Sequence, residues 1–141
     1  MEIKIKRLNK EAILPKYANL GDAGLDLFSL EDCILSPGES HTFALGFALE
    51  FSEDYTALIW DKSGMAFKND IHVIGGVFDA GYRGEYRIKL VNLGDKEYKI
   101  EKGDKIAQVL IQPIIHANII VVRKLSESVR GDGAYGSTGR K

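Results

Sequence analysis

From residue 41 to residue 51 the chain reads His41-Thr42-Phe43-Ala44-Leu45-Gly46-Phe47-Ala48-Leu49-Glu50-Phe51, with a large apolar side chain at every second position from Phe43 onward. Successive side chains of a β-strand point to opposite faces, so a period of two gathers these large side chains on one face. A face made only of phenylalanine and leucine predicts a strand that packs against a hydrophobic core. The stretch therefore indicates a β-protein.

Strand-like patterns continue on both sides of this stretch. Only residues 63–67 favour a helix, which Ser63 could cap. Many short strands at roughly 8 to 12 residue spacing predict an all-β sandwich, jelly roll or barrel. Turn residues separate the further strands that we expect, which cover residues 2–7, 25–28, 33–35, 55–60, 71–74, 86–92, 97–100, 105–112 and 119–124.

Length and charge narrow the class of protein. A chain of 141 residues fits one globular domain. Its 19 basic and 20 acidic residues give a net charge of −1, so the chain has no excess of positive charge that would bind nucleic acid or an anionic membrane. No apolar run approaches the roughly 18 residues of a membrane span, and the start of the chain lacks a signal-peptide pattern. Because Cys33 is the single cysteine, we expect no intramolecular disulfide and a cytoplasmic protein. From the charge and the short apolar runs we expect neither nucleic-acid nor membrane partners.

The end of the chain differs from the rest. Residues 126–141 hold four glycines and almost no large apolar side chains, so they cannot build a core of their own. We therefore expect a β-domain over residues 1–125 and a flexible, glycine-rich arm over residues 126–141. An ordinary disordered terminus is the alternative interpretation.

The order of residues in the arm favours anion binding. Glycine amides can approach an anion closely, Arg130 supplies a bidentate fork, and Ser137 and Thr138 add hydroxyl donors. Tyr135 adds a flat face on which a base could stack. The spacing of the glycines matches neither a Walker loop nor a Rossmann loop.

Two more segments have residues suited to binding a ligand. Residues 75–85 place four glycines around Asp79 and Tyr82 in an expected hairpin, although an ordinary β-turn with a solvated aspartate would read the same way. Residues 61–66 join a strand end to a helix start, where free amides and the helix dipole favour anions. A plain helix cap is the alternative for this second segment.

Two polar side chains interrupt apolar strands. Asp26 alternates with Leu25 and Leu27, so we expect it to face away from them, towards a cleft or water. Gln108 interrupts an apolar strand and needs a hydrogen-bond partner if it is buried. Each is compatible with a purely structural role.

Asp26 lies in the segment 22–27 and Gln108 in the segment 103–108. Taken in order with residues 61–66, residues 75–85 and the arm, they resemble the five motifs of the trimeric deoxyuridine triphosphatase (dUTPase) family, over about residues 22–139. The resemblance implies a jelly-roll-like distorted β-barrel and a homotrimer with active sites shared between subunits. It also implies Mg²⁺-assisted cleavage of dUTP to dUMP and pyrophosphate, which limits uracil in DNA and supplies dUMP for dTMP synthesis.

The resemblance assigns roles residue by residue. Asp79 would activate the water that attacks the α-phosphorus, and Asp26 would act on the metal through water. Tyr82 would pack under the deoxyribose, and Tyr135 would stack on uracil. The complete set of expected substrate-binding residues is Lys62, Ser63, Gly64, Gly76, Val77, Tyr82, Gln108, Arg130, Tyr135, Gly136, Ser137 and Thr138.

Two positions depart from the family pattern. The second motif commonly reads Pro-Arg-Ser-Gly, whereas Asp61 and Lys62 stand at the first two positions here. Lysine binds through one ammonium group, whereas the guanidinium of arginine can donate two parallel hydrogen bonds to a phosphate. The pattern therefore does not fix how the phosphates are held at this position. Tyr135 stands where phenylalanine is usual, a change that keeps the stacking face.

Three other classes of protein fit less well. A dCTP deaminase of the same fold needs a glutamate ten residues after the hairpin aspartate, and this chain has Lys89 there. A non-catalytic jelly-roll binding module would not need Asp79, Tyr82, Gln108 and the arm together. Serine or cysteine hydrolase chemistry would need a free histidine, whereas His41, His72 and His116 all lie in strand patterns typical of structural histidines.

Overall fold

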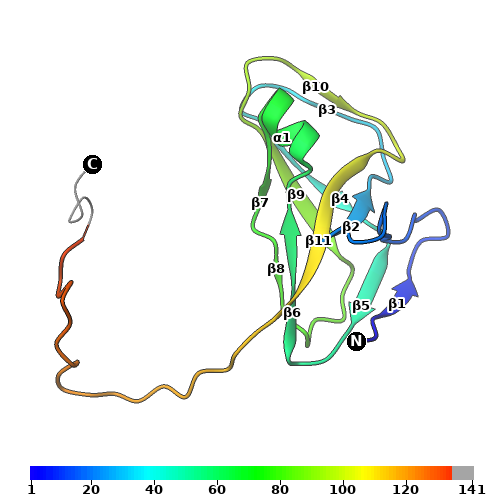
Figure 1. Ribbon diagram of the computed structural model, residues 1–141. Helices are drawn as coiled ribbons and strands as arrows, with labels where there is room; N and C mark the ends of the chain where they lie inside the picture. Colours follow the sequence, from blue (N-terminus) through cyan, green and yellow to red (C-terminus); the bar gives the residue numbers. More distant parts are fainter. Residues whose placement is uncertain (135–141) are drawn as a thin grey trace.

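Within residues 1–134, eleven short strands and one helix make up the fold, which confirms the predicted all-β class (Figure 1). The computed structural model describes residues 1–134. The elements are β1 (Lys4–Arg7), β2 (Leu25–Phe28), β3 (Cys33–Leu35), β4 (Ser40–Ala44), β5 (Phe47–Glu50), β6 (Tyr55–Trp60), α1 (Ser63–Asn69), β7 (Ile71–Ile74), β8 (Val77–Phe78), β9 (Arg87–Asn92), β10 (Tyr98–Ile100) and β11 (Lys105–Pro113).

Hydrogen bonding divides the described strands into four small antiparallel sheets rather than one closed barrel. Two sheets have two strands each, β1-β5 and β10-β3. A third has the order β4-β9-β7, and the largest has the order β2-β11-β6-β8. The largest sheet carries three of the predicted functional residues, Asp26 on β2, Gln108 on β11 and Val77 on β8.

The alternating stretch forms the centre of the core, as predicted. Its five large side chains expose between 0% and 7% of their surface. The stretch is nevertheless two strands, because Gly46 adopts a left-handed φ of +70°. A Cβ there would lie 2.9 Å or less from Asn9, Ala12 and Leu30, so only glycine fits. The first half, β4, pairs with β9, and the second half, β5, pairs with β1.

The helix begins and ends without side-chain caps. Its N-cap residue is Lys62, which is extended at φ −78° and ψ 121° and makes no capping hydrogen bond through its side chain. The expected cap at Ser63 was wrong, because Ser63 is already the first helical residue. The helix ends at Asn69, and the C-cap residue Asp70 is left-handed at φ 54° and donates its amide to the Ala66 carbonyl at 3.1 Å.

After β11 the chain leaves the body of the molecule (Figure 1). Residues 114–134 contain neither helix nor strand, so the strand expected over 119–124 was wrong. A strand needs a neighbouring strand to satisfy its backbone groups, and the described chain offers none at this place. Several large apolar side chains of the segment are more than half exposed: Ile115, Ile119, Ile120, Val121, Val122, Leu125 and Val129.

Candidate active site

A charged cluster lies where β2 and β11 run beside the end of β6. Asp26 is only 2% exposed, so the expectation that it faces a cleft or water was wrong. The Lys62 ammonium donates to its Oδ1 atom at 2.7 Å, and the Lys105 ammonium forms an ion pair with its Oδ2 atom at 2.7 Å. Sequence reasoning did not find Lys105, because only strand pairing brings it beside Asp26.

The two lysines determine the charge of Asp26. Burial by itself raises the pKa of this carboxyl, but the ammonium groups of Lys105 and Lys62 outweigh that effect and hold the pKa below its usual range. Asp26 is therefore an anion at neutral pH. Its negative charge keeps two cationic side chains together at one place.

Gln108 lies beside this cluster and has the partner that its position requires. On β11 it stands opposite Asp26 on one side and Trp60 on the other. Its Nε2 atom donates to the main-chain carbonyl of Asp61 at 2.9 Å. A Cβ at Gly24 would lie 2.6 Å from the Gln108 Oε1 atom, so any larger residue there would displace the Gln108 side chain.

The first turn of α1 adjoins the same cluster. Ser63 and Gly64 are exposed there, where the amides of a helix have no partner within the helix. Lys62, Ser63, Gly64 and Gln108, all predicted to bind phosphate, are thus brought together by the ends of β6 and β11 and the start of α1. Two ammonium groups and exposed amides make this region, here called the phosphate cluster, suitable for an anion.

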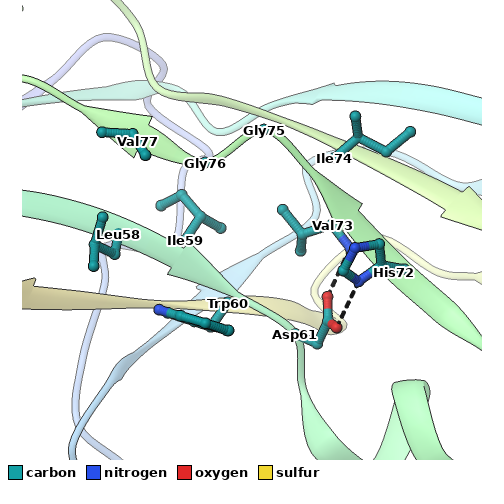
Figure 2. A pocket seen from close by; sticks show the side chains of 10 residues that line it. All are labelled: Leu58, Ile59, Trp60, Asp61, His72, Val73, Ile74, Gly75, Gly76 and Val77. Atoms are coloured by element: carbon teal, nitrogen blue, oxygen red, sulfur yellow. Dashed lines mark hydrogen bonds and ion pairs between the residues drawn. The ribbon is translucent and has the colours of Figure 1, made fainter. Parts of the chain in front are cut away.

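A cavity of about 410 Å³ lies beside this cluster, between β6 and the turn from β7 to β8 (Figure 2). Its walls include Trp60, Asp61 and Ile74 together with the main chain of Gly75, Gly76 and Val77. Gly76 is left-handed at φ +114°, and its carbonyl accepts from the Ile59 amide at 2.7 Å. A flat ligand in this cavity would meet main-chain donors and acceptors on one side.

Asp79 and Tyr82 follow β8 in the hairpin and lie elsewhere. Asp79 is exposed beside a second hollow of about 280 Å³, which Thr56 and His116 also line. The Tyr82 hydroxyl donates to the Glu85 carbonyl at 2.9 Å, and its ring centroid lies 5.8 Å from that of Phe78. The Tyr82 amide donates to the Asp79 carbonyl at 3.0 Å, which closes the turn.

A single chain does not bring the two groups of candidates together. On β8, Phe78 pairs with Ala57 of β6, whereas Gln108 pairs with Trp60 at the far end of that strand. Asp79 follows Phe78, so it lies four strand positions from the level of Gln108. At about 3.3 Å per residue, Asp79 is about 13 Å along the strand from the phosphate cluster. The arm residue Arg130 is exposed and donates to the Gly133 carbonyl at 3.0 Å, and Tyr135, Gly136, Ser137 and Thr138 lie outside the described residues.

The dUTPase family model matches residues 10–139 of this chain. This chain belongs to the dUTPase family. Among its relatives, the deoxyuridine 5'-triphosphate nucleotidohydrolase of Clostridium tetani is 49% identical over 98% of this chain and 97% of its own length. The enzyme of the same name from Clostridioides difficile is 43% identical over 97% of each chain.

Solved dUTPase structures have the same fold. The dUTPase of Staphylococcus bacteriophage 80alpha with dUpNHpp superposes with a TM-score of 0.91 at 30% identity, covering 98% of each chain. A mutant dUTPase from phage phi11 of S. aureus, described with a coordinated structural Mg(II) ion, has a TM-score of 0.82 at 26% identity, covering 88% of this chain and 98% of its own. This agreement confirms the predicted jelly-roll-like class.

Each of the three histidines has a hydrogen-bond partner within the chain. His41 Nε2 lies 3.0 Å from a Glu31 carboxylate oxygen, and His116 Nε2 lies 3.2 Å from the Glu53 carbonyl. His72 Nδ1 lies 2.8 Å from Asp61 Oδ2. Lys89 is exposed on β9.

The described residues contain neither a cluster of metal-binding side chains nor a membrane-spanning helix. Within residues 1–134, no three histidine, cysteine or acidic side chains lie close enough together to hold a metal ion. Asp26 does not fit as a direct ligand, because both its oxygens contact lysines. No helix in the described part of the chain is long and apolar enough to cross a membrane.

Proposed function

We propose that this chain hydrolyses dUTP to dUMP and pyrophosphate. The observation that carries the proposal is the match to the dUTPase family over residues 10–139, which includes all five candidate segments. The names of the relatives from Clostridium tetani and Clostridioides difficile and the dUpNHpp bound to the phage enzyme support it. This activity would limit uracil in DNA and supply dUMP for dTMP synthesis.

The cavity between β6 and the β7–β8 turn is the proposed site for uracil. Main-chain groups of Gly76 and Val77 would pair with the base edge. Cytosine presents the reverse pattern at N3 and C4, so it would leave those groups unpaired and would be rejected. Tyr82 would pack under the deoxyribose, where a ribose 2′-hydroxyl would be buried without a partner at a cost of about 1 to 3 kcal/mol.

Asp79 is the proposed general base. Its carboxylate would accept a proton from a water molecule while the water oxygen forms a bond to the α-phosphorus. The bond from that phosphorus to the bridging oxygen would break, and pyrophosphate would leave with the bonding electron pair. Assistance of this kind contributes about 10² to 10⁴ in rate.

The phosphate cluster would bind the triphosphate. Lys62, Ser63, Gly64 and Gln108 would contact the inner phosphates through one ammonium group, exposed amides and a side-chain amide. The arm would close over the nucleotide, with Arg130, Gly136, Ser137 and Thr138 at the γ-phosphate and Tyr135 stacked on the base. Stacking is worth about 1 to 3 kcal/mol per base.

A homotrimer with shared active sites is the proposed assembly. Asp79 of one chain lies about 13 Å along β6 from its own phosphate cluster, so the hairpin of one copy would serve a nucleotide held by the cluster of another. The exposed apolar side chains of residues 114–125 would find cover against a neighbouring copy.

Mg²⁺ is the proposed cofactor and would arrive on the phosphate oxygens. The phi11 relative supports a role for this ion. Mg²⁺ keeps several waters and is usually bound through substrate phosphates, so it would supply charge neutralisation without a protein cage. Asp26 could contact such an ion through water only once Lys62 or Lys105 moves to a phosphate.

Release of pyrophosphate from dUTP, dCTP, dTTP and UTP tests the function directly. We expect release from dUTP alone, and its loss when EDTA removes Mg²⁺. Deamination of dCTP, or no reaction with any nucleotide, would contradict the proposal.

The variant Asp79→Asn tests the proposed base in the same assay. Asparagine cannot accept the proton, so turnover should fall by about 10² to 10⁴ while affinity for dUpNHpp stays nearly constant. Pyrophosphate release at the wild-type rate would remove Asp79 from the mechanism.

A further inference from the structure

The Asp61 carboxylate connects the end of β6 to β7. Its Oδ1 atom accepts from the main-chain amide of Val73 at 2.6 Å, and its Oδ2 atom lies 2.8 Å from His72 Nδ1 (Figure 2). The side chain of Asp61 is only 24% exposed, against 57% for His72. Both carboxylate oxygens are therefore engaged by the neighbouring strand.

The main chain of Asp61 makes a third connection. Its carbonyl accepts from the side-chain amide of Gln108, which belongs to β11. The next residue, Lys62, is held by Asp26 of β2. Asp61 is thus the point at which β6, β7 and β11 are joined beside the phosphate cluster.

Besides Asp61, the segment that follows is held by the contact of Lys62 with Asp26 and by Met65 of α1, which packs into the core. Only Asp61 and Lys62 separate β6 from α1, and the helix has no side-chain cap. By contrast, Val73 is secured independently, because β7 pairs with β9 over four residues that include it. Loss of the Asp61 carboxylate should therefore displace residues 61–64 and Gln108 more than it displaces the cavity wall.

We propose that Asp61 is a positioning residue, which aligns Lys62, Ser63, Gly64 and Gln108 for the phosphates without contacting the nucleotide itself. The proposal rests on the function proposed above. It accounts for an acidic residue beside an anion site, because both oxygens of this carboxylate are directed to donors on β7 rather than to the phosphates.

The affinities for two ligands, dUpNHpp and dUMP, distinguish a misaligned phosphate cluster from a general loss of structure. Uracil and sugar would bind at the hairpin, whereas the cluster would contact the inner phosphates, of which dUMP keeps only the α-phosphate. For Asp61→Ala we therefore expect affinity for dUpNHpp to fall about tenfold, while affinity for dUMP changes less than about twofold. Isothermal titration calorimetry on the full-length protein measures both affinities.

Three further variants make the result specific. Asp61→Asn keeps an acceptor for the Val73 amide and should restore dUpNHpp affinity to within about threefold of wild type. His72→Ala removes one of the two donors and should have an intermediate effect. Asp32→Ala is the matched control, because Asp32 also accepts from a distant main-chain amide, that of Lys102 at 2.8 Å, but lies between β2 and β3.

The outcomes are distinguishable. Equal weakening of both ligands, no weakening in Asp61→Ala, or an effect of Asp32→Ala as large as that of Asp61→Ala would overturn the positioning role. Should Asp61→Ala fail to fold, the dUpNHpp to dUMP affinity ratios of Asp61→Asn and His72→Ala decide the matter. Wild-type protein that neither binds dUpNHpp nor releases pyrophosphate from dUTP would instead refute the proposed function.

Discussion

At the scale of single residues, Tyr86 is the least expected member of the core. It is fully buried, and its ring stacks between those of Phe78 and Phe47 at centroid distances of 4.3 and 5.6 Å. Within residues 1–134 its hydroxyl has no hydrogen-bond partner. Burial, reinforced by the neighbouring Tyr82, raises the pKa of Tyr86 to about 12. Burial of the ring stabilises the hairpin, whereas burial of the unpartnered hydroxyl lowers the free energy of unfolding.

The variant Tyr86→Phe should therefore be at least as stable as wild type at neutral pH, gaining up to about 1 kcal/mol. The pH dependence follows from the raised pKa. An unfolded tyrosine ionises near pH 10, so wild type should lose stability as the pH rises from about 10 to 12, and the phenylalanine variant should lose less. Urea unfolding at pH 7 and pH 11 measures both effects. A variant that is less stable at pH 7 would show that the hydroxyl has a partner in solution.

Residue patterns predicted the chemistry of the site better than its contacts. The alternation around Asp26 indicated a side chain opposite to the leucines, and Gln108 was expected to need a partner. The neighbours of Asp26 were not predictable, because Lys62 and Lys105 reach it from segments 36 and 79 positions away in the sequence. Local periodicity carries no information about such pairing. For the same reason, the sequence did not predict the hydrogen bonds between Asp61 and β7.

At the scale of elements, Gly76 determines the shape of the turn between β7 and β8. It combines a left-handed φ of +114° with close packing, since a Cβ there would lie 2.9 Å from the Ile59 carbonyl oxygen. Gly81, in the same hairpin, has neither constraint, because no heavy atom lies within 4 Å of its Cβ position. The two glycines form a matched pair.

Gly76→Ala should lower the free energy of unfolding by about 2 kcal/mol, through backbone strain and the clash with the strand behind it. Gly81→Ala should change it by less than about 0.5 kcal/mol. Equilibrium urea unfolding of both variants checks the difference. Equal stability of the two would mean that the turn can rearrange.

Strands were predictable where sequence pattern and local backbone agreed. Residues 25–28, 33–35, 55–60 and 71–74 form strands with the predicted bounds. The run from Phe43 to Phe51 was expected as one strand, but the positive φ of Gly46 divides it, and alternation does not reveal a backbone dihedral. The strand expected over 119–124 has a suitable pattern but no partner in the described chain.

At the scale of the whole molecule, the described part of the arm, residues 126–134, adds little to the stability of the body. The described hydrogen bonds of residues 127–134 remain local, such as those from Arg130 to Gly133 and from Gly131 to Ser128. Most of their side chains are exposed. We therefore expect the arm to act on ligand binding rather than on stability.

Deletion of residues 127–141 should leave the urea unfolding curve and the oligomeric state unchanged. Release of pyrophosphate from dUTP should fall at least about tenfold, since base stacking alone is worth about 1 to 3 kcal/mol. Light scattering after size-exclusion chromatography and the pyrophosphate assay measure the two properties. Full activity of the truncated protein would make the arm an ordinary terminus.

The distance between the hairpin and the phosphate cluster along β6 has a genetic consequence. In the proposed trimer, a mutation in Asp79 and a mutation in Gln108 damage different contributors to each active site. A cell that expresses both defective alleles would assemble some mixed trimers in which one site receives an intact hairpin and an intact cluster. Two recessive alleles of this one gene would therefore complement each other.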